Sequence, residues 1–468
     1  MTSILDARPD RGEQEGWIVD DRGVPRVMVA RDRGQVRIHY RAAAGAPWVK
    51  LDEQSTTTPG WRPVAIADDD KTLLVADQRT RDKAAIVRYD PATKTFGEVL
   101  AEHPQVDLFG VIGDYGHAVG VYYEADRGGT AWFDAELAGI QASVDRAMPG
   151  YVNRLSWSRD RNVVLVDSRS DRTPGSLYLL DRKAGKMEWL FDRRPWIKPA
   201  EMAPMKAVTY PARDGLPIPA YLTVPKDSPG KDLPMVVVIH GGPWVSGETW
   251  GFDPEAQFLA SRGYAVLQPN FRGTTRYGWK HFASSFNQWG LAMQDDIEDG
   301  VRWAVAQGIA DPKRVCLYGG SYGGYATMMG LAKTPDVYRC GINYVGVTDL
   351  SLLMTATWSD NAYSQSVQHT YREMIGDVDR DAARLTATSP VNLADRIKAP
   401  VMLVYGGMDA RVPIAHGTRM RSALESAGAK PIWIAPEGEG HGFRDLKNQK
   451  VFYEAMEKFL DENIGAKR

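Results

Sequence analysis

One short run constrains the fold of this chain more than any other. In "RVCLYGGSYGGYATMMG", residues 314–330, a serine stands between paired glycines. An apolar run typical of a buried strand precedes the serine, and apolar residues at helical spacing follow it. The stretch from Gly319 to Gly323 matches G-x-S-x-G, a sharp strand-to-helix turn that exposes a serine hydroxyl above a sheet. A phosphate-binding turn fits less well because no Gly-Lys-Ser/Thr follows. The run therefore predicts Ser321 as a nucleophile.

The second part of the chain, from about residue 203, alternates buried strands with amphipathic helices. The expected strands are "MVVVIHGG", "YAVLQPNFRG", "RVCLYGG", "CGINYVGV", "VMLVYGGMD" and "IWIAPEGEGH". Between or after them lie the expected helices "PEAQFLASRG", "QDDIEDGVRWAVAQG", "YATMMGLAKT", "PIAHGTRMRSALESAG" and "NQKVFYEAMEKFLDENIG". This alternation predicts a doubly wound, mostly parallel sheet, and with the serine turn it predicts an α/β-hydrolase domain over residues 201–468.

The first part of the chain, residues 1–200, has a different pattern, in which short β-rich runs alternate with turns and helical periodicity is nearly absent. An aromatic or aliphatic residue followed by aspartate and a turn recurs at Asp90, Asp134 and Asp181, at separations of 44 and 47 residues. That spacing is the length of a four-stranded propeller blade. We expect an all-β, propeller-like domain of about four blades; an irregular sandwich is the alternative. Whether the propeller is complete stays open.

Composition excludes several classes of function. There are 57 lysines and arginines against 59 aspartates and glutamates, a formal charge of −2, so no basic field favours nucleic acid. The two cysteines, Cys316 and Cys340, lie in expected buried strands and support neither a disulfide framework nor a zinc site. The start "MTSILDARPDRGEQEGW" lacks an apolar leader, and no apolar run approaches the ~18 residues of a membrane span. We expect a cytoplasmic protein without membrane contact, metal or cofactor; self-association stays open.

A serine nucleophile needs a general base and an orienting carboxylate, which in this fold follow in the order serine, acid, histidine. Three histidines come after Ser321. His369 precedes the expected acid and His416 lies on an amphipathic helix, whereas His441 follows the last strand in "GEGHGF". Asp409, beyond a strand end in "VMLVYGGMDARVP", is the expected acid. Its alternative role is to cap the next helix, which would leave the histidine without an orienting group.

An oxyanion hole requires two N–H groups directed at the developing negative charge. Tyr322, the residue after the nucleophile, is expected to supply one. The loop "VVVIHGGPW" follows an early strand, and Gly242 is expected to supply the other. A simple tight turn is the alternative for this loop.

The motifs "HGGPW", "NFRGTTRYG", "DDIEDGVRW", "GGSYGGY", "YGGMDARVP" and "EGHGF" stand in this order between residues 235 and 445. Together they resemble the catalytic domain of the prolyl oligopeptidase family of serine peptidases, and the propeller-like first part is similar to that family as well. The combination of H-G-G-P with G-G-S-Y-G-G is closest to the acylaminoacyl-peptidase-like branch.

The resemblance implies a triad of Ser321, Asp409 and His441 and oxyanion donors at Tyr322 and Gly242. It also implies that Arg411, two residues after the acid, holds a carbonyl group of the substrate; a surface arginine is the alternative. We therefore expect a serine peptidase that hydrolyses short or N-acylated peptides.

Two alternative activities share the same machinery. One is a carboxylesterase or lipase. The other is a dipeptidyl peptidase, although the first 200 residues lack the paired glutamates that this branch uses to bind a free amine. Trp358 and Tyr363 lie where the fold inserts segments that contact substrate, and they are candidates for the wall of a side-chain pocket; plain core residues are the alternative.

Overall fold

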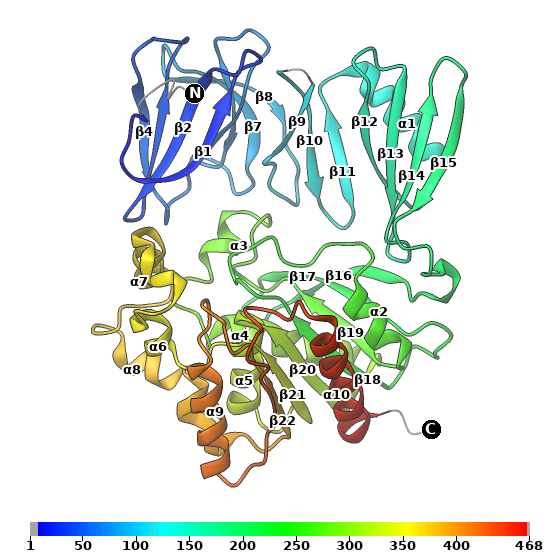
Figure 1. Cartoon of the computed structure of the whole chain (residues 1–468), viewed down its shortest axis with the longest axis vertical. Coiled ribbons are helices and arrows are strands. Elements are labelled where there is room, and N and C mark those ends of the chain that lie inside the picture. Colours follow the sequence, from blue (N-terminus) through cyan, green and yellow to red (C-terminus); the bar gives the residue numbers. More distant parts are fainter. Residues whose placement is uncertain (1–7, 115, 466–468) are drawn as a thin grey trace. The chain divides into compact units, whose positions relative to one another are not determined.

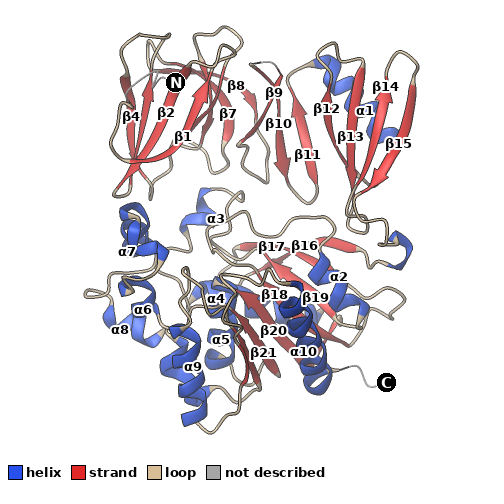
Figure 2. Ribbon diagram, in the orientation of Figure 1, coloured by secondary structure: helices blue, strands red, loops and turns tan. Residues whose placement is uncertain are grey.

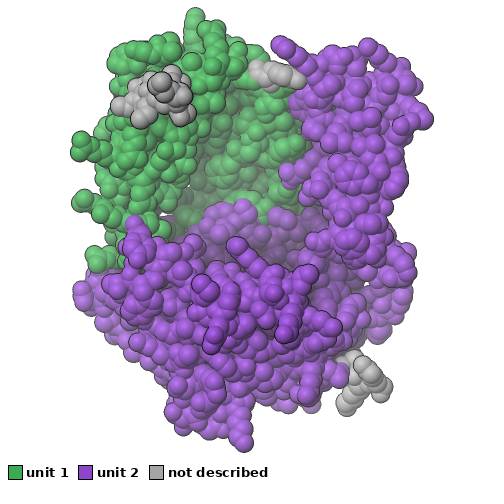
Figure 3. All heavy atoms as spheres, in the orientation of Figure 1, with its two compact units in different colours: residues 1–144, 276–283, 364–374 green, residues 145–275, 284–363, 375–468 purple. Residues whose placement is uncertain are grey.

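The computed structural model describes residues 8–114 and 116–465. The first seven residues, part of the start in which no apolar leader was expected, lie outside this range. The chain divides into two compact units, which Figure 3 distinguishes by colour. Unit 1 comprises residues 1–144, 276–283 and 364–374, and unit 2 comprises residues 145–275, 284–363 and 375–468. The expected domain limit at residue 200 stays a prediction.

Unit 1 is built mainly from antiparallel sheets of consecutive strands (Figure 1). The first sheet contains β1 (Glu13–Val19), β2 (Pro25–Asp32), β3 (Gln35–Tyr40) and β4 (Val49–Ser55), and the second contains β5 (Trp61–Ile66), β6 (Leu73–Asp77), β7 (Ala85–Asp90) and β8 (Thr95–Ala101). The third contains β9 (Gly110–Asp114), β10 (His117–Glu124) and β11 (Gly128–Trp132). Helices α3 (Trp279–Ala283) and α7 (Gln365–Met374) also belong to this unit.

The aspartate repeat marks the end of the third strand in successive sheets. Asp90 ends β7, and its carboxylate accepts the backbone N–H of Ala92 at 2.8 Å. Asp181 likewise ends the third strand of the fourth sheet. Asp134 follows β11, but there the fourth strand is replaced by helix α1 (Ala135–Ala147), whose Leu137 N–H is accepted by the Asp134 carboxylate at 2.9 Å. The antiparallel sheets expected of a propeller-like first part are present, and α1 is a helix among them that the sequence pattern did not indicate.

The fourth antiparallel sheet belongs to unit 2 and contains β12 (Val152–Trp157), β13 (Val163–Arg169), β14 (Ser176–Asp181) and β15 (Lys186–Asp192). The loop after β13 connects this fourth sheet to the start of the main sheet of unit 2 through hydrogen bonds. The carboxylate of Asp171 accepts the N–H of Met205 at 2.8 Å, and its carbonyl accepts from the Gln257 amide at 3.1 Å. These buried bonds fix the start of the next sheet.

The main sheet of unit 2 has eight strands in the order β16-β17-β19-β18-β20-β21-β22-β23. They are β16 (Met205–Pro211), β17 (Pro217–Thr223), β18 (Leu233–Ile239), β19 (Ala265–Pro269), β20 (Ala310–Gly320), β21 (Cys340–Tyr344), β22 (Val401–Val404) and β23 (Ile432–Ile434). The pairings of β17 with β16 and with β19 are antiparallel, so β17 alone runs against the others, and the remaining six strands pair in parallel. The prediction of a doubly wound, mostly parallel α/β-hydrolase sheet is confirmed.

Helices cover the main sheet because its strand residues are apolar on both faces (Figure 2). One apolar cluster joins Val236 and Tyr318 to Leu259 of α2 (Pro254–Ser261) and Phe452 of α10 (Leu446–Ile464). Leu317 points the other way, toward α5. The remaining helices of the unit are α4 (Ala292–Ala306), α5 (Tyr322–Lys333), α6 (Leu350–Thr355), α8 (Ala382–Ala387) and α9 (Ala415–Ser426), with short 3₁₀ turns η1 (Pro199–Glu201), η2 (Asp360–Tyr363) and η3 (Pro390–Arg396).

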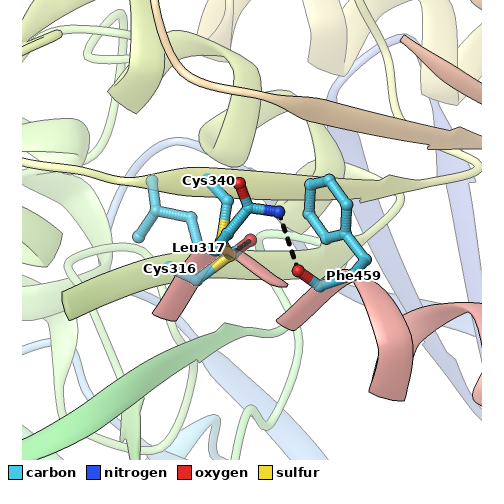
Figure 4. Close-up of a disulfide and its surroundings, with 5 residues drawn as sticks. Cys316, Leu317, Cys340 and Phe459 are labelled. Carbon is cyan, nitrogen blue, oxygen red and sulfur yellow. Dashed lines mark hydrogen bonds between the residues drawn. A yellow bond between two sulfur atoms is a disulfide. The ribbon is translucent and has the colours of Figure 1, made fainter. Parts of the chain in front are cut away.

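The two cysteines form a disulfide, contrary to the expectation from the sequence (Figure 4). Cys316 on β20 and Cys340 on β21 are direct partners in the parallel pairing, with Cα atoms 4.7 Å apart. Both are fully buried in the apolar cluster that includes Phe459. The pairing depends on which strands are neighbours and in what register, and a spacing of 24 residues does not encode either.

No helix in the described part of the chain is long and apolar enough to cross a membrane.

Candidate active site

Ser321 occupies the turn between β20 and α5, at the carboxyl end of a central strand of the main sheet. Its φ of 59° and ψ of −117° place a non-glycine residue in a rarely populated region of backbone space. A Cβ atom on Gly319 would lie 2.6 Å from the carbonyl oxygen of Ile239, and one on Gly323 would overlap the same oxygen. The two glycines therefore allow β20 and α5 to approach β18 closely enough for this turn.

The loop after β18 lies against the serine. A Cβ atom on Gly241 would be 3.3 Å from Cβ of Ser321 and 3.9 Å from its Oγ, so a side chain there would fill the space in front of the hydroxyl. Gly242 has φ +113°, a conformation that side chains rarely adopt. Tyr322 begins α5, whose first N–H groups have no partner within the helix. The sequence-predicted oxyanion loop and Ser321 are thus neighbours.

Residue His240 fixes the course of that loop. Its Nε2 lies 2.9 Å from Oγ1 of Thr274, and its ring stacks on Phe271 with centroids 4.4 Å apart. Phe271 in turn packs against the ring of Tyr322 at 5.2 Å. The histidine is therefore a structural member of the loop.

Asp409 and His441, separated by 32 residues, meet beyond the ends of β22 and β23. Oδ2 of Asp409 lies 2.7 Å from Nδ1 of His441. Oδ1 of the same carboxylate accepts the backbone N–H groups of Arg411 at 2.8 Å and Val412 at 2.9 Å. The Asp409 side chain is fully buried, whereas that of His441 is 30% exposed. The carboxylate is thus held rigidly, and the imidazole it orients has one nitrogen accessible.

Backbone hydrogen bonds between the loop of Asp409 and the loop of His441 hold the two residues opposite each other. The N–H of Gly407 donates to the carbonyl of Pro436 at 3.0 Å, and that of Met408 donates to the carbonyl of Glu439 at 2.8 Å. A Cβ atom on Gly406 would overlap the carbonyl oxygen of Gly440. The glycines of "YGGMD" therefore permit a close backbone contact that places the aspartate opposite the histidine.

The loop that carries His441 is held by two further side chains. The buried carboxylate of Glu439 accepts the N–H groups of Arg444 at 2.8 Å and Asp445 at 3.0 Å. These backbone hydrogen bonds lower the pKa of Glu439. The Tyr344 hydroxyl accepts the N–H of Phe443. Together these contacts fix the backbone of residues 443–445, which follow the histidine.

His416, the other histidine near the acid in sequence, is fully buried. Nδ1 of this histidine accepts the N–H of Thr348 at 3.3 Å. Burial lowers the pKa of His416 to about 4, so the ring stays neutral and enclosed. It is not placed to act as a base.

Arg411 contacts a residue that the sequence did not single out. Nε of its guanidinium lies 2.8 Å from Oδ1 and 2.7 Å from Oδ2 of Asp360 in η2. The arginine side chain is 54% exposed. Trp358 and Tyr363, in the segment that carries Asp360, are 58% and 83% exposed.

The structure brings most of the predicted site residues into two groups. One contains Asp409, His441 and Arg411, and the other contains Ser321 with the loop of Gly242. In residues 8–114 and 116–465 there is no hydrogen bond between the Ser321 hydroxyl and His441. Hydrogen bonds to catalytic serines commonly tighten only when substrate is bound.

Two residues that lie in these groups were missed, Tyr344 and Asp360. They are 97 and 81 residues from His441, and neither stands in a motif. Within the described residues, no group of three or more histidine, cysteine or carboxylate side chains is arranged to hold a metal ion.

Comparison with known proteins gives the family. A family model described as the prolyl oligopeptidase family matches residues 250–467, which include Ser321, Asp409 and His441. Dipeptidyl aminopeptidase BIII of Pseudoxanthomonas mexicana is 33% identical over 97% of this chain, which spans 67% of that protein. The acylamino-acid-releasing enzyme of Arabidopsis thaliana is 30% identical over 45% of this chain, which spans 28% of that protein.

Solved structures have the same fold. A crystal structure of puromycin hydrolase superimposes with a TM-score of 0.77 at 23% identity, covering 98% of this chain and 70% of that one. An acylaminoacyl peptidase in complex with Z-Gly-Gly-Phe-chloromethyl ketone gives a TM-score of 0.69 at 19% identity, covering 94% and 69%. The family model and the relative that is matched over nearly the whole chain show that this protein is a serine peptidase of the prolyl oligopeptidase family.

Proposed function

We propose that this protein hydrolyses peptide bonds of short or N-acylated peptides through Ser321, His441 and Asp409. The observation that supports this most strongly is the 2.7 Å contact between the buried Asp409 carboxylate and Nδ1 of His441. In the neutral tautomer whose Nδ1–H donates a hydrogen bond to Asp409, Nε2 carries no proton and can act as a base.

In the first step, Oγ of Ser321 attacks the carbonyl carbon of the substrate while Nε2 of His441 takes the hydroxyl proton. The Asp409 carboxylate stabilises the imidazolium that forms. The oxyanion accepts hydrogen bonds from the N–H groups of Tyr322 and Gly242. The left-handed backbone at Ser321 and the small Gly241 leave room for the tetrahedral centre.

In the second step, the intermediate collapses and the amine leaves with the proton that His441 had taken. The acyl group stays on Ser321 as an ester. Water then attacks this ester, with Nε2 of His441 accepting its proton, and the acid product is released. Each proton removed from a nucleophile is returned to a leaving group by the same nitrogen, so one histidine serves both steps.

Arg411 is proposed to hold a carbonyl oxygen of the substrate on the amino-terminal side of the cleaved bond. It stands two residues from Asp409, and over half of its side chain is exposed. A guanidinium offers several donors in one plane, which suits a peptide carbonyl.

The test of the proposed mechanism is a Ser321→Ala variant. We expect kcat on a peptide anilide to fall roughly 10⁴-fold or more, with the circular dichroism spectrum unchanged. A fluorophosphonate probe should label the wild-type protein and not the variant. Retained hydrolysis by Ser321→Ala, or labelling of a different residue, would refute the mechanism.

Release of dipeptides from a free amino terminus is a second candidate function. It is favoured by the similarity to the dipeptidyl aminopeptidase of Pseudoxanthomonas mexicana over 97% of this chain. The two functions separate on one pair of substrates, a dipeptidyl anilide with a free amine and its N-acetyl derivative. Preference for the acetylated form supports the first function, and preference for the free amine supports the second.

Ester hydrolysis uses the same groups and is the remaining alternative. Rates on a simple nitrophenyl ester and on the better of the two anilides should be compared at equal enzyme concentration. An esterase without peptidase function would cleave the ester and leave both anilides intact.

A further inference from the structure

We infer that Asp360 is a positioning residue that orients Arg411 and cancels its charge, so that the site selects neutral groups over carboxylates next to the cleaved residue. This inference rests on the proposed role of Arg411 in binding substrate. It assigns a function to a residue that lies 51 positions away in the sequence.

The geometry divides the guanidinium into two edges. Both oxygens of Asp360 lie within 2.8 Å of Nε, so the carboxylate occupies the edge near the side-chain stem. Among the described residues, the two terminal NH₂ groups of Arg411 have no hydrogen-bond partner. They carry four N–H donors on a side chain that is 54% exposed. Asp360 therefore holds the arginine without consuming the donors that substrate needs.

Asp360 is itself fixed by the loop that carries the triad acid. Its backbone N–H donates to the carbonyl of Ala410 at 2.8 Å, and Ala410 lies between Asp409 and Arg411. The backbone N–H of Arg411 donates to Asp409. The carboxylate, the guanidinium and the acid of the triad thus share one short network, and substrate held by Arg411 is held relative to His441.

The pairing also sets the charge of the site. An isolated arginine with four free donors would bind a carboxylate more tightly than a neutral carbonyl, because the carboxylate adds a Coulombic attraction. Asp360, which is 39% exposed, adds an opposite charge at hydrogen-bond distance. The Arg411–Asp360 pair has no net charge, so it does not attract a ligand carboxylate as an isolated arginine would. The Asp360 carboxylate also repels it.

The surroundings fit a neutral, partly apolar ligand. Trp358, Tyr363 and Met408 are 58%, 83% and 72% exposed, and they lie on the two segments that carry Asp360 and Arg411. Large apolar side chains left exposed next to polar donors are typical of a binding surface. The favoured substrate is a peptide whose residue before the cleaved residue is uncharged.

The test uses two substrates that differ by one charge: peptide anilides with glutamine or with glutamate immediately before the cleaved residue. For each enzyme, the glutamate-to-glutamine ratio of kcat/KM is measured. Asp360→Asn keeps the shape of the side chain and removes its charge, so we expect this ratio to rise about fivefold, carried by KM. The rise should shrink in 0.5 M salt, because partly exposed charges are screened.

Three further variants separate charge from structure. Asp360→Glu, which restores the charge, should return the ratio toward that of the wild type. In an Arg411→Gln background, Asp360→Asn should leave the ratio unchanged, because the two residues act through each other. Asp336→Asn removes the same charge from an exposed pair with Lys398 beyond the far end of α5, and should not change the ratio.

The outcomes distinguish this inference from the proposed function. If the wild type cleaves the anilides but Asp360→Asn leaves the ratio unchanged, the inference is wrong and the proposed function stands. The same holds if the ratio changes equally with and without Arg411. If the wild type cleaves neither anilide, the proposed function fails and the inference fails with it.

Discussion

The backbone carbonyl of Tyr344 accepts the amide hydrogen of Ser321 at 2.9 Å, while its phenol hydroxyl accepts the amide hydrogen of Phe443. One residue at the end of β21 therefore contacts both the serine turn and the loop of His441. Its ring stacks on Phe452 of α10 with centroids 5.0 Å apart and an interplanar angle of 9°. Burial raises the pKa of Tyr344 to about 12, so the hydroxyl remains neutral at physiological pH.

Replacing Tyr344 with phenylalanine should loosen the histidine loop without moving the serine turn. The backbone contact to Ser321 stays, but the N–H of Phe443 loses its acceptor. We expect kcat to fall about tenfold with KM changed less than twofold, since a small displacement of the base affects chemistry more than binding. Steady-state kinetics on a peptide anilide measure this.

Tyr453→Phe is the matched control for that variant. The Tyr453 hydroxyl donates to the half-buried Glu255 at 2.8 Å and, among the described residues, contacts neither catalytic loop. Both substitutions remove one hydrogen-bonded, half-buried hydroxyl, so both should cost about 1 kcal/mol of unfolding free energy. Only Tyr344→Phe should lower kcat; an equal loss in both variants would show that stability alone is responsible.

Substitutions at two neighbouring glycines of the serine turn should differ sharply in effect. A Cβ atom on Gly323 would overlap the carbonyl oxygen of Ile239, whereas one on Gly320 would make ordinary contacts with Tyr344, at 3.5 Å from its ring and 3.7 Å from its carbonyl oxygen. We expect Gly323→Ala to lower the unfolding free energy by about 3 kcal/mol or to prevent folding, and Gly320→Ala to cost less than about 1 kcal/mol. Urea denaturation followed by fluorescence compares them, and similar midpoints for the two variants would contradict the described turn.

The Asp409→Asn variant should remain folded and lose most of its activity. Asparagine can still accept the N–H groups of Arg411 and Val412 through its oxygen, but its amide faces Nδ1 of His441 and favours the wrong tautomer. We expect kcat to fall about 10³- to 10⁴-fold. Glu437→Gln makes the same change from carboxylate to carboxamide at an exposed residue in the loop before His441. This variant should keep kcat within twofold of wild type. A comparable loss in both variants would argue against the role of Asp409.

Acid should destabilise the protein through His416. The pKa of this buried histidine is lowered from 6.5 to about 4, so the folded state stays unprotonated where the unfolded chain binds a proton. Stability is therefore full above pH 6.5 and is lost as the pH falls toward 4. At pH 5 the expected cost is about 2 kcal/mol relative to pH 7.

A His416→Asn variant isolates that contribution. Asparagine does not titrate, and its oxygen can accept the N–H of Thr348 in place of Nδ1. The unfolding free energy of the wild type should drop between pH 7 and pH 5 by about 2 kcal/mol more than that of the variant. Parallel losses in the two proteins would mean that other groups cause the acid sensitivity.

Local sequence patterns suffice for elements whose physical cause lies within a few residues. The serine turn was predicted because its glycines are required by contacts within a few residues, and the strands were predicted because each is a short, continuous apolar run. Helix α1 was missed because the Asp134 carboxylate accepts the N–H of the third residue on at the start of a helix, and Asp90 makes the same kind of contact with Thr93 in a turn. An aspartate before a turn-like segment therefore does not distinguish a hairpin turn from the start of a helix.

Sequence alone determined the six parallel strands of the main sheet, the turn at Ser321 and the candidate acid and base, because all of these depend on residue types at short spacing. Tertiary structure decided which distant segments meet. The pairing of Cys316 with Cys340 follows from strand order and register, and the contact between Asp360 and Arg411 follows from the packing of two loops. Such contacts join residues whose sequence neighbours carry no trace of the partner, so only the folded chain reveals them.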